Sequence, residues 1–153
     1  MPGVVKAARR FLSVLDLSAF SIEKEKQFRA KLDQTTERLR KALPRGAQHW
    51  GVARKVLNIF LRDALYTIYL REEYGLACVE RFLEVPLDSI TAKELKKAAG
   101  RGGLPQWPGV KGVAPDLSER FQAQATKVAT ERRMSRVHLD AYWWADRPDD
   151  DAP

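Results

Sequence analysis

The stretch from Val52 to Tyr69 is apolar on nearly every side, and no other feature of this chain constrains its fold so strongly. A helix that is apolar all round has to be buried, so we expect a helix that runs through the middle of the core. With 153 residues, the chain is long enough for one domain to bury about two-thirds of its unfolded surface. The apolar positions are Val52, Val56, Leu57, Ile59, Phe60, Leu61, Leu65, Ile68 and Tyr69.

Helical spacing continues on both sides of this stretch. Phe28, Leu32, Leu39 and Leu43 recur at helical steps, with Ser21 as the expected cap. No internal repeat and no convincing strand is present, so the expected fold class is all-α. Further elements are expected as a short helix over 76–83, a helix from Asp88 or Ser89 to about Ala99, a glycine- and proline-rich loop over 100–115, a helix from Asp116 or Ser118 to Arg133, and an aromatic end over 137–144.

The charge is distributed unevenly between the body and the end of the chain. The chain has 27 basic and 20 acidic residues, a formal charge of +7. Because 146–153 holds four Asp and one Arg, we expect one compact helical domain over 1–145 and an acidic, disordered tail. The body alone carries +10, which predicts a polyanionic partner, most simply double-stranded DNA. The alternative is a surface that is basic only for solubility.

Composition also excludes several classes of protein. The single Cys78 excludes an internal disulfide and a multi-cysteine metal site, and with two histidines no metal site or cofactor is expected. No apolar run approaches a membrane span, and the start lacks the layout of a signal peptide. We therefore expect a cytoplasmic monomer that has no contact with a membrane.

The segment that begins at Gly51 combines features that suit a phosphate. It follows a loop and opens the apolar helix, and backbone N–H groups at a helix start are unpaired and lie at the positive end of the dipole. Arg54 and Lys55 add positive charge there. Gly51 permits close approach of a phosphate to the backbone.

These residues resemble the helix-hairpin-helix DNA glycosylases, the superfamily of endonuclease III and 8-oxoguanine glycosylase. Gly51, Val52, Arg54 and Lys55 match the hairpin of that family, and the segment 85–88, Val-Pro-Leu-Asp, is similar to its second landmark. The resemblance implies that Lys55 is the nucleophilic lysine and Asp88 the catalytic aspartate. It also implies that Gly51, Val52 and Arg54 hold DNA.

Two of the departures from the family pattern concern the candidate site itself. Ala53 replaces the second hairpin glycine. Lys55 and Asp88 are 33 residues apart, a longer separation than is usual in the family.

The chemistry of base excision suits these residue types. A neutral lysine amine can attack the anomeric carbon of the sugar and form a Schiff base, which permits later strand cleavage. An aspartate can accept a proton and stabilise positive charge on the sugar. The flipped base needs a pocket of aromatic and polar groups, for which the candidates are Gln48, His49, Trp50, Asp140, Trp143 and Trp144, with Trp107, His138 and Tyr142 as further possibilities. The candidates for contacts to the DNA backbone around the glycine-rich loop are Lys97, Arg101 and Lys111.

Each of these assignments has a plainer alternative. Lys55 also suits a lysine that only binds phosphate, and Asp88 suits a helix cap that has no chemistry. The aromatic end over 142–144 suits a hydrophobic anchor. The leading hypothesis is a DNA glycosylase for a damaged or modified base, and its small size is compatible with antiviral defence against phage that carry modified bases. The alternatives are a non-catalytic DNA-binding module and a helical interaction protein.

Overall fold

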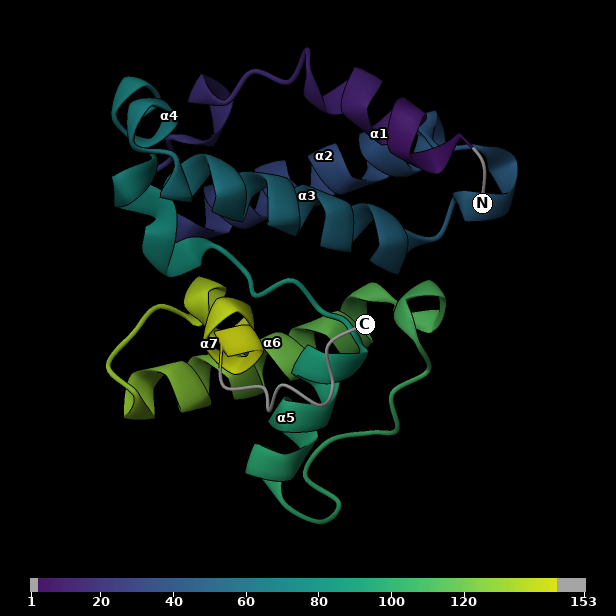
Figure 1. Ribbon diagram of the computed structural model, residues 1–153, viewed down its shortest axis with the longest axis vertical. Helices are drawn as coiled ribbons and strands as arrows, with labels where there is room; N and C mark the ends of the chain where they lie inside the picture. The colour runs from purple at the N-terminus through teal and green to yellow at the C-terminus, as the bar shows by residue number, and fades with distance from the viewer. Residues whose placement is uncertain (1–2, 146–153) are drawn as a thin grey trace.

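The computed structural model describes residues 3–145, and every regular element among them is helical (Figure 1). The expected all-α fold is therefore confirmed. The acidic tail expected over 146–153 lies outside the described residues. The α-helices are α1 (Val4–Leu12), α2 (Glu25–Ala42), α3 (Trp50–Tyr66), α4 (Ile68–Glu73), α5 (Ser89–Ala99), α6 (Pro115–Glu131) and α7 (Leu139–Ala145), and the 3-10 helices are Ser18–Phe20, Arg45–Ala47, Leu76–Phe82, Val110–Gly112 and Arg136–His138.

The first layer of the molecule consists of α1 to α4, with α3 at its centre (Figure 1). Leu57 and Leu61 of α3 pack with Phe28 and Leu39 of α2 in a core that excludes water almost completely. The expected buried helix is therefore present.

The buried helix ends earlier than the sequence predicted. Thr67 takes an extended backbone conformation with ψ 107°, and the chain turns there into α4. Ile68 and Tyr69, which were expected in the core, are instead 53% and 81% exposed.

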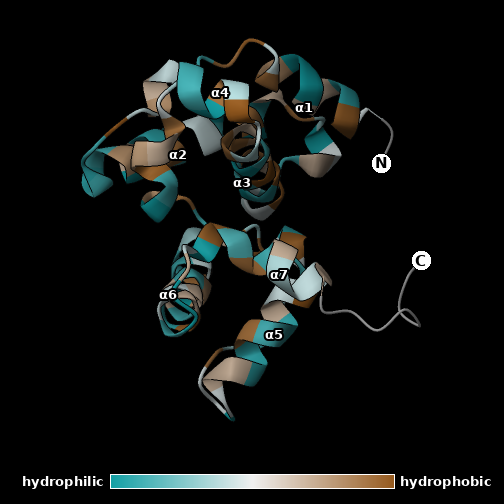
Figure 2. Ribbon diagram, turned by 60° about the vertical axis from the view of Figure 1, so that its left-hand side comes forward, coloured by the Kyte–Doolittle hydropathy of each residue, from teal (hydrophilic) through white to brown (hydrophobic). Residues whose placement is uncertain are grey.

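The second layer consists of α5 to α7 and has a core of its own. Leu95, Phe121, Leu139 and Trp143 are buried in it, and Trp107 from the long loop packs edge-on against Phe121 with ring centroids 5.4 Å apart. Figure 2 shows α3 lying above α6 on one side and α7 on the other. Trp143 thus takes the anchoring role that was the plainer alternative for the aromatic end.

Two of the expected helix starts turn out differently. Ser21 closes the 3-10 turn Ser18–Phe20, and α2 begins four residues later, so the expected cap at Ser21 is wrong. The helix expected from Asp116 or Ser118 begins at Pro115, because proline, which lacks a backbone N–H, suits the first position of a helix. The expected cap at Asp88 is confirmed: its Oδ1 accepts hydrogen bonds from the backbone N–H groups of Ile90 and Thr91.

The segment 83–88 joins the two layers and is held along its length. The side-chain amide of Gln122 both accepts from the Val85 N–H, at 3.1 Å, and donates to the Val85 carbonyl, at 2.8 Å. Arg136 donates to the carbonyls of Phe82 and Leu83, each at 3.0 Å. These bonds place Asp88 at a fixed point between the layers.

Candidate active site between the two helical layers

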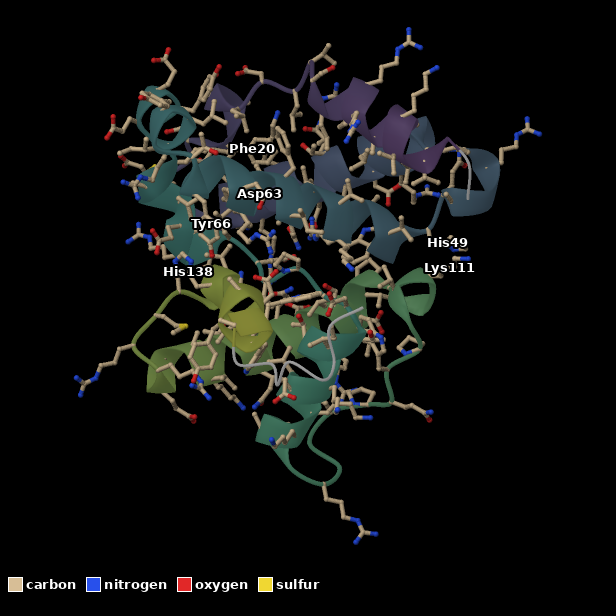
Figure 3. The ribbon with its side chains drawn as sticks, in the orientation of Figure 1. Phe20, His49, Asp63, Tyr66, Lys111 and His138 are labelled. Atoms are coloured by element: carbon tan, nitrogen blue, oxygen red, sulfur yellow. The ribbon has the colours of Figure 1, made fainter. Side chains whose placement is uncertain are left out.

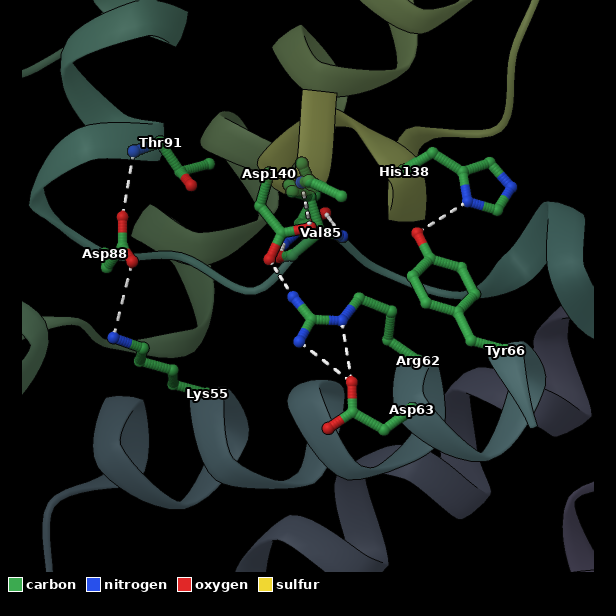
Figure 4. Close-up of polar contacts among 11 residues, drawn as sticks. Lys55, Arg62, Asp63, Tyr66, Val85, Asp88, Thr91, His138 and Asp140 are labelled. Carbon is green, nitrogen blue, oxygen red and sulfur yellow. Dashed lines mark hydrogen bonds and ion pairs between the residues drawn. The ribbon is translucent and has the colours of Figure 1, made fainter. Parts of the chain in front are cut away.

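Lys55 and Asp88 meet where α3 faces the start of α5 (Figure 4). The Nζ of Lys55 lies 3.5 Å from Oδ2 of Asp88, and the two side chains are 29% and 19% exposed. The pair is thus partly shielded from water and still open to a ligand. The convergence that the resemblance requires of these two residues is present.

The two oxygens of Asp88 have separate partners. Oδ1 caps α5 through Ile90 and Thr91 at 3.0 and 2.9 Å, while Oδ2 faces Lys55. The cap fixes the orientation of the carboxylate, so the capping role and a chemical role are compatible in one side chain.

The pair is the first of three contacts that follow one side of α3. Lys55, Arg62 and Tyr66 lie seven and four residues apart and reach Asp88, Asp140 and His138 of the second layer (Figure 4). Arg62 contacts Asp140 and also forms an ion pair with Asp63 at 2.9 Å. Burial raises the pKa of the Asp140 carboxyl although Arg62 opposes this shift. We call the three contacts the interlayer row.

The last contact of the interlayer row extends into a chain of hydrogen bonds. Tyr66 Oη lies 2.9 Å from His138 Nδ1, and His138 Nε2 lies 2.9 Å from Glu80 Oε1. Ser135 donates to the same Glu80 oxygen at 3.1 Å. The hydrogen bond from His138 lowers the pKa of Glu80, and burial raises the pKa of Tyr66.

Glu80 is expected to make the protein less stable in acid. Its pKa is lower in the folded protein than its ordinary value of 4.5, so the unfolded chain binds more protons between these two pKa values, and the stabilisation is lost as the pH falls through the folded value. Urea unfolding at about pH 7 and at about pH 3 measures how much unfolding free energy each protein loses on acidification. This loss should be smaller in Glu80→Gln than in the parent protein. Exposed Glu73→Gln is the control, and an equal loss in Glu80→Gln and the parent would contradict this assignment.

Gly51 has a different role from the one expected. It lies in the first turn of α3, inside the helix, and the preceding connection is residues 43–49. The hairpin turn expected at Gly51–Ala53 is therefore not formed. A Cβ at Gly51 would lie 2.8 Å from Val113 Cβ and closer still to the carbonyl oxygen of Val110. The glycine lets α3 pack against the 3-10 turn Val110–Gly112, which occupies the place expected for a phosphate.

Gly51→Ala is expected to lower the free energy of unfolding by about 1–3 kcal/mol, the usual cost of overpacking. The added methyl group would push the backbone of Val110 away from α3. Urea unfolding measures the effect. Gly46→Ala is the matched control, because nothing lies within 4 Å of a Cβ there. Equal stability of the two variants would show that the contact is not tight in solution.

Arg54 is buried, in contrast to the surface position expected of a DNA contact. Its guanidinium donates to Thr36 Oγ1 at 2.8 Å and contacts the Asp33 carboxylate. Its Nε lies 3.1 Å from Glu84 Oε2, and the group stacks over the Trp50 ring at 4.8 Å. With only 6% of the residue exposed, Arg54 ties α2 and α3 to Glu84 in the connecting segment 83–88. The structure thus gives the Arg54 guanidinium partners within the chain, and a contact between Arg54 and DNA stays a prediction.

The remaining DNA-contact candidates divide into two places. Val52 is partly buried against the first core. Lys111 lies in the 3-10 turn Val110–Gly112, which packs against the start of α3 (Figure 3). Lys97 and Arg101 are exposed at the far end of α5, and at 1.5 Å per residue Lys97 lies about 13 Å along the helix from Asp88.

The six base-pocket candidates do not share one pocket. Gln48 donates to the carbonyls of Lys41 and Leu43 at the end of α2. His49 and Trp50 begin α3, whereas Asp140 and Trp143 are buried in α7. Trp144 is 48% exposed.

The hollow that Lys55 lines is small. It holds about 10 Å³, between the start of α3 and the residues Leu87, Val110 and Val113. That is room for about one water molecule, so in this conformation a nucleobase does not fit there.

Sequence reasoning missed two residues that the structure places between the layers. Arg62 has the spacing that could have revealed it, because it follows Lys55 by seven residues and so shares its side of the helix. Glu84 is a carboxylate within the apolar run 82–87 and is only 5% exposed. An isolated charge in such a run is a signal of a buried ion pair.

Comparison with family models, with curated proteins and with solved structures gives no match to this chain. None of the described helices is long and apolar enough to cross a membrane.

Proposed function

We propose that this protein is a DNA glycosylase that removes a damaged or modified base, with an associated lyase activity. The observation that carries the proposal is the meeting of Lys55 and Asp88. These residues are 33 positions apart and come from different layers, yet their charged atoms lie 3.5 Å apart at a partly exposed point.

The proposed reaction uses the two groups in sequence. Asp88 Oδ2 accepts a proton from the Lys55 ammonium group, and the neutral amine attacks the anomeric carbon as the bond to the base breaks. The departing base takes the bonding electron pair and a proton from water. The C1′–O4′ bond then breaks, and O4′ keeps its electron pair and takes the proton that the attached amine releases, so that a Schiff base joins Lys55 to the opened sugar. Loss of a C2′ proton to water and departure of the 3′ phosphate cleave the strand, and water then hydrolyses the Schiff base to free Lys55. The carboxylate also stabilises positive charge on the sugar in the transition state.

The charge of the body supports DNA as the substrate. Residues 1–145 carry +10, and the exposed Lys97, Arg101 and Lys111 are available for backbone phosphates. Because the hollow at Lys55 is small, we propose that DNA binding separates α3 from α5 and α7 enough for a flipped base to enter. The polar interlayer row suits such a movement better than an apolar interface would.

Borohydride trapping tests the proposal directly. The protein is incubated with duplexes that carry damaged, mismatched, methylated, hydroxymethylated or glucosylated bases, and alkali-revealed abasic sites are scored in parallel. A trapped adduct on at least one duplex is the expected result. Abasic sites without an adduct would replace the lysine mechanism by one in which Asp88 activates water. Salt-dependent binding with neither product on any duplex would overturn the proposal.

Asp88→Asn is expected to separate the two roles of this residue. Asparagine caps helices about as well as aspartate, so the unfolding free energy should change by less than about 1 kcal/mol. Product formation should fall by about 10²-fold, because the amide cannot accept the proton. Asp88→Ala loses the cap as well and should cost about 1 kcal/mol more. Full activity in Asp88→Asn would leave Asp88 as a cap alone.

The small hollow at Lys55 favours a second candidate, a non-catalytic DNA-binding module. In this case Lys55 binds a phosphate and the layers do not separate. Lys55→Gln would then weaken salt-dependent DNA binding mildly, and no product would form on any substrate.

A further inference from the structure

A cavity of about 250 Å³ lies between α2, the start of α3 and the start of α6. Neither Lys55 nor Asp88 lines it, and it adjoins the hollow at Lys55 through the shared residues Trp50, Arg54 and Ser118. Its volume is below the roughly 300–1,000 Å³ of sites for drug-sized ligands, which indicates a small ligand.

Two polar groups in the cavity wall make no hydrogen bond among residues 3–145. Ser118 is 3% exposed, and its hydroxyl makes no hydrogen bond within that part of the chain. Arg54 Nε is also without a hydrogen bond, although Glu84 lies 3.1 Å from it. The Arg54 Nε–H is a donor and faces Glu84, so the group in the wall that can still accept a hydrogen bond from a ligand is the Ser118 hydroxyl.

The cavity is acidic although the protein is basic. Four carboxylates and two guanidinium groups line it, a formal charge of −2 against +7 for the chain. Asp116 forms no ion pair with any other described residue. The buried Glu84 uses its Oε2 for Asn58 and Arg54, and its Oε1 accepts no hydrogen bond from any described residue. The lining charges are Asp33, Glu84, Asp116, Glu119, Arg29 and Arg54.

Trp50 gives the cavity an aromatic wall. Its ring already attracts one guanidinium group, that of Arg54, at 4.8 Å, and an indole face is the best aromatic surface for a cation. We propose that this cavity binds a small organic cation that carries a guanidinium or primary amine group, held by Asp116, Glu84 and the Ser118 hydroxyl. The group can come from a free amine or from an arginine side chain of a peptide.

Isothermal titration calorimetry with agmatine tests the proposal on the full chain without DNA. Saturable binding with a dissociation constant of about 1 mM or tighter is expected, and it should weaken as salt is added. Asp116→Asn and Ser118→Ala should each weaken binding about tenfold, because each loses a hydrogen bond to a charged group. Asp116 is exposed, so its substitution leaves the fold intact. Exposed Glu73→Gln removes the same charge elsewhere and should leave binding unchanged.

A second titration with an acetylated, amidated arginine distinguishes the two sources. Binding of agmatine alone assigns the cavity to free amines, and binding of both ligands also admits an arginine side chain. No saturable heat with either ligand overturns the proposal. Equal weakening in Asp116→Asn and Glu73→Gln also overturns it, because attraction to the whole surface would then explain the binding. The test is independent of the proposed glycosylase activity, since it involves neither DNA nor Lys55.

Discussion

Lys55→Gln is expected to abolish borohydride trapping and to lower strand cleavage by at least about 10³-fold, as loss of a nucleophile does in other covalent enzymes. Glutamine has no amine that can form a Schiff base. The substitution leaves Asp88 bound to the N–H groups of Ile90 and Thr91, so the start of α5 should stay formed. The measurement is the yield of trapped adduct on the duplex that gives the most product with the parent protein.

Lys93→Gln is the matched control for this variant. Lys93 is an exposed lysine on α5, so its loss removes the same single positive charge from the helix that Asp88 caps. It should reduce binding slightly and leave the adduct intact. An adduct that persists in Lys55→Gln would place the nucleophile on another amine, and unchanged production of abasic sites without an adduct would show that water is the nucleophile.

Arg54→Ala is expected to lower the free energy of unfolding by about 3–5 kcal/mol, the usual cost of breaking a buried ion pair. The Glu84 side chain is 6% exposed and would keep a buried charge whose remaining hydrogen-bond partner among residues 3–145 is Asn58, at 3.1 Å. Asp33 contributes less, because more than half of its side chain is exposed and water can solvate it. Urea unfolding measures the loss.

A double-mutant cycle separates the cost of leaving the Glu84 charge buried without Arg54 from the other contacts that Arg54→Ala removes. Arg54→Ala combined with Glu84→Gln should recover part of the loss, because the buried charge is then neutral. Arg120→Ala removes an exposed arginine on α6 and should change stability by less than about 0.5 kcal/mol. If Arg54→Ala instead keeps full stability and loses DNA affinity, the structural role of Arg54 is wrong and the role as a DNA contact is restored.

The sequence by itself determined the elements that depend on local patterns. The apolar run beginning at Val52 required a buried helix because a helix that is apolar on every side has no face to present to water. Asp88 after a proline-containing break predicted a cap because a short carboxylate reaches the free N–H groups two and three residues ahead. The resemblance also paired Lys55 with Asp88, and the structure brings them together.

Only the tertiary structure decided what the polar residues near the start of α3 contact. An arginine beside a helix start suits a phosphate or a buried carboxylate equally well, and the choice depends on Asp33 and Glu84, which lie 21 and 30 positions away in the chain. Gly51 suits close approach by a ligand or by the chain itself, and here the backbone of Val110 takes that place. Local periodicity determines which face of a helix is apolar, but the partner of a polar group depends on which distant segment packs against it.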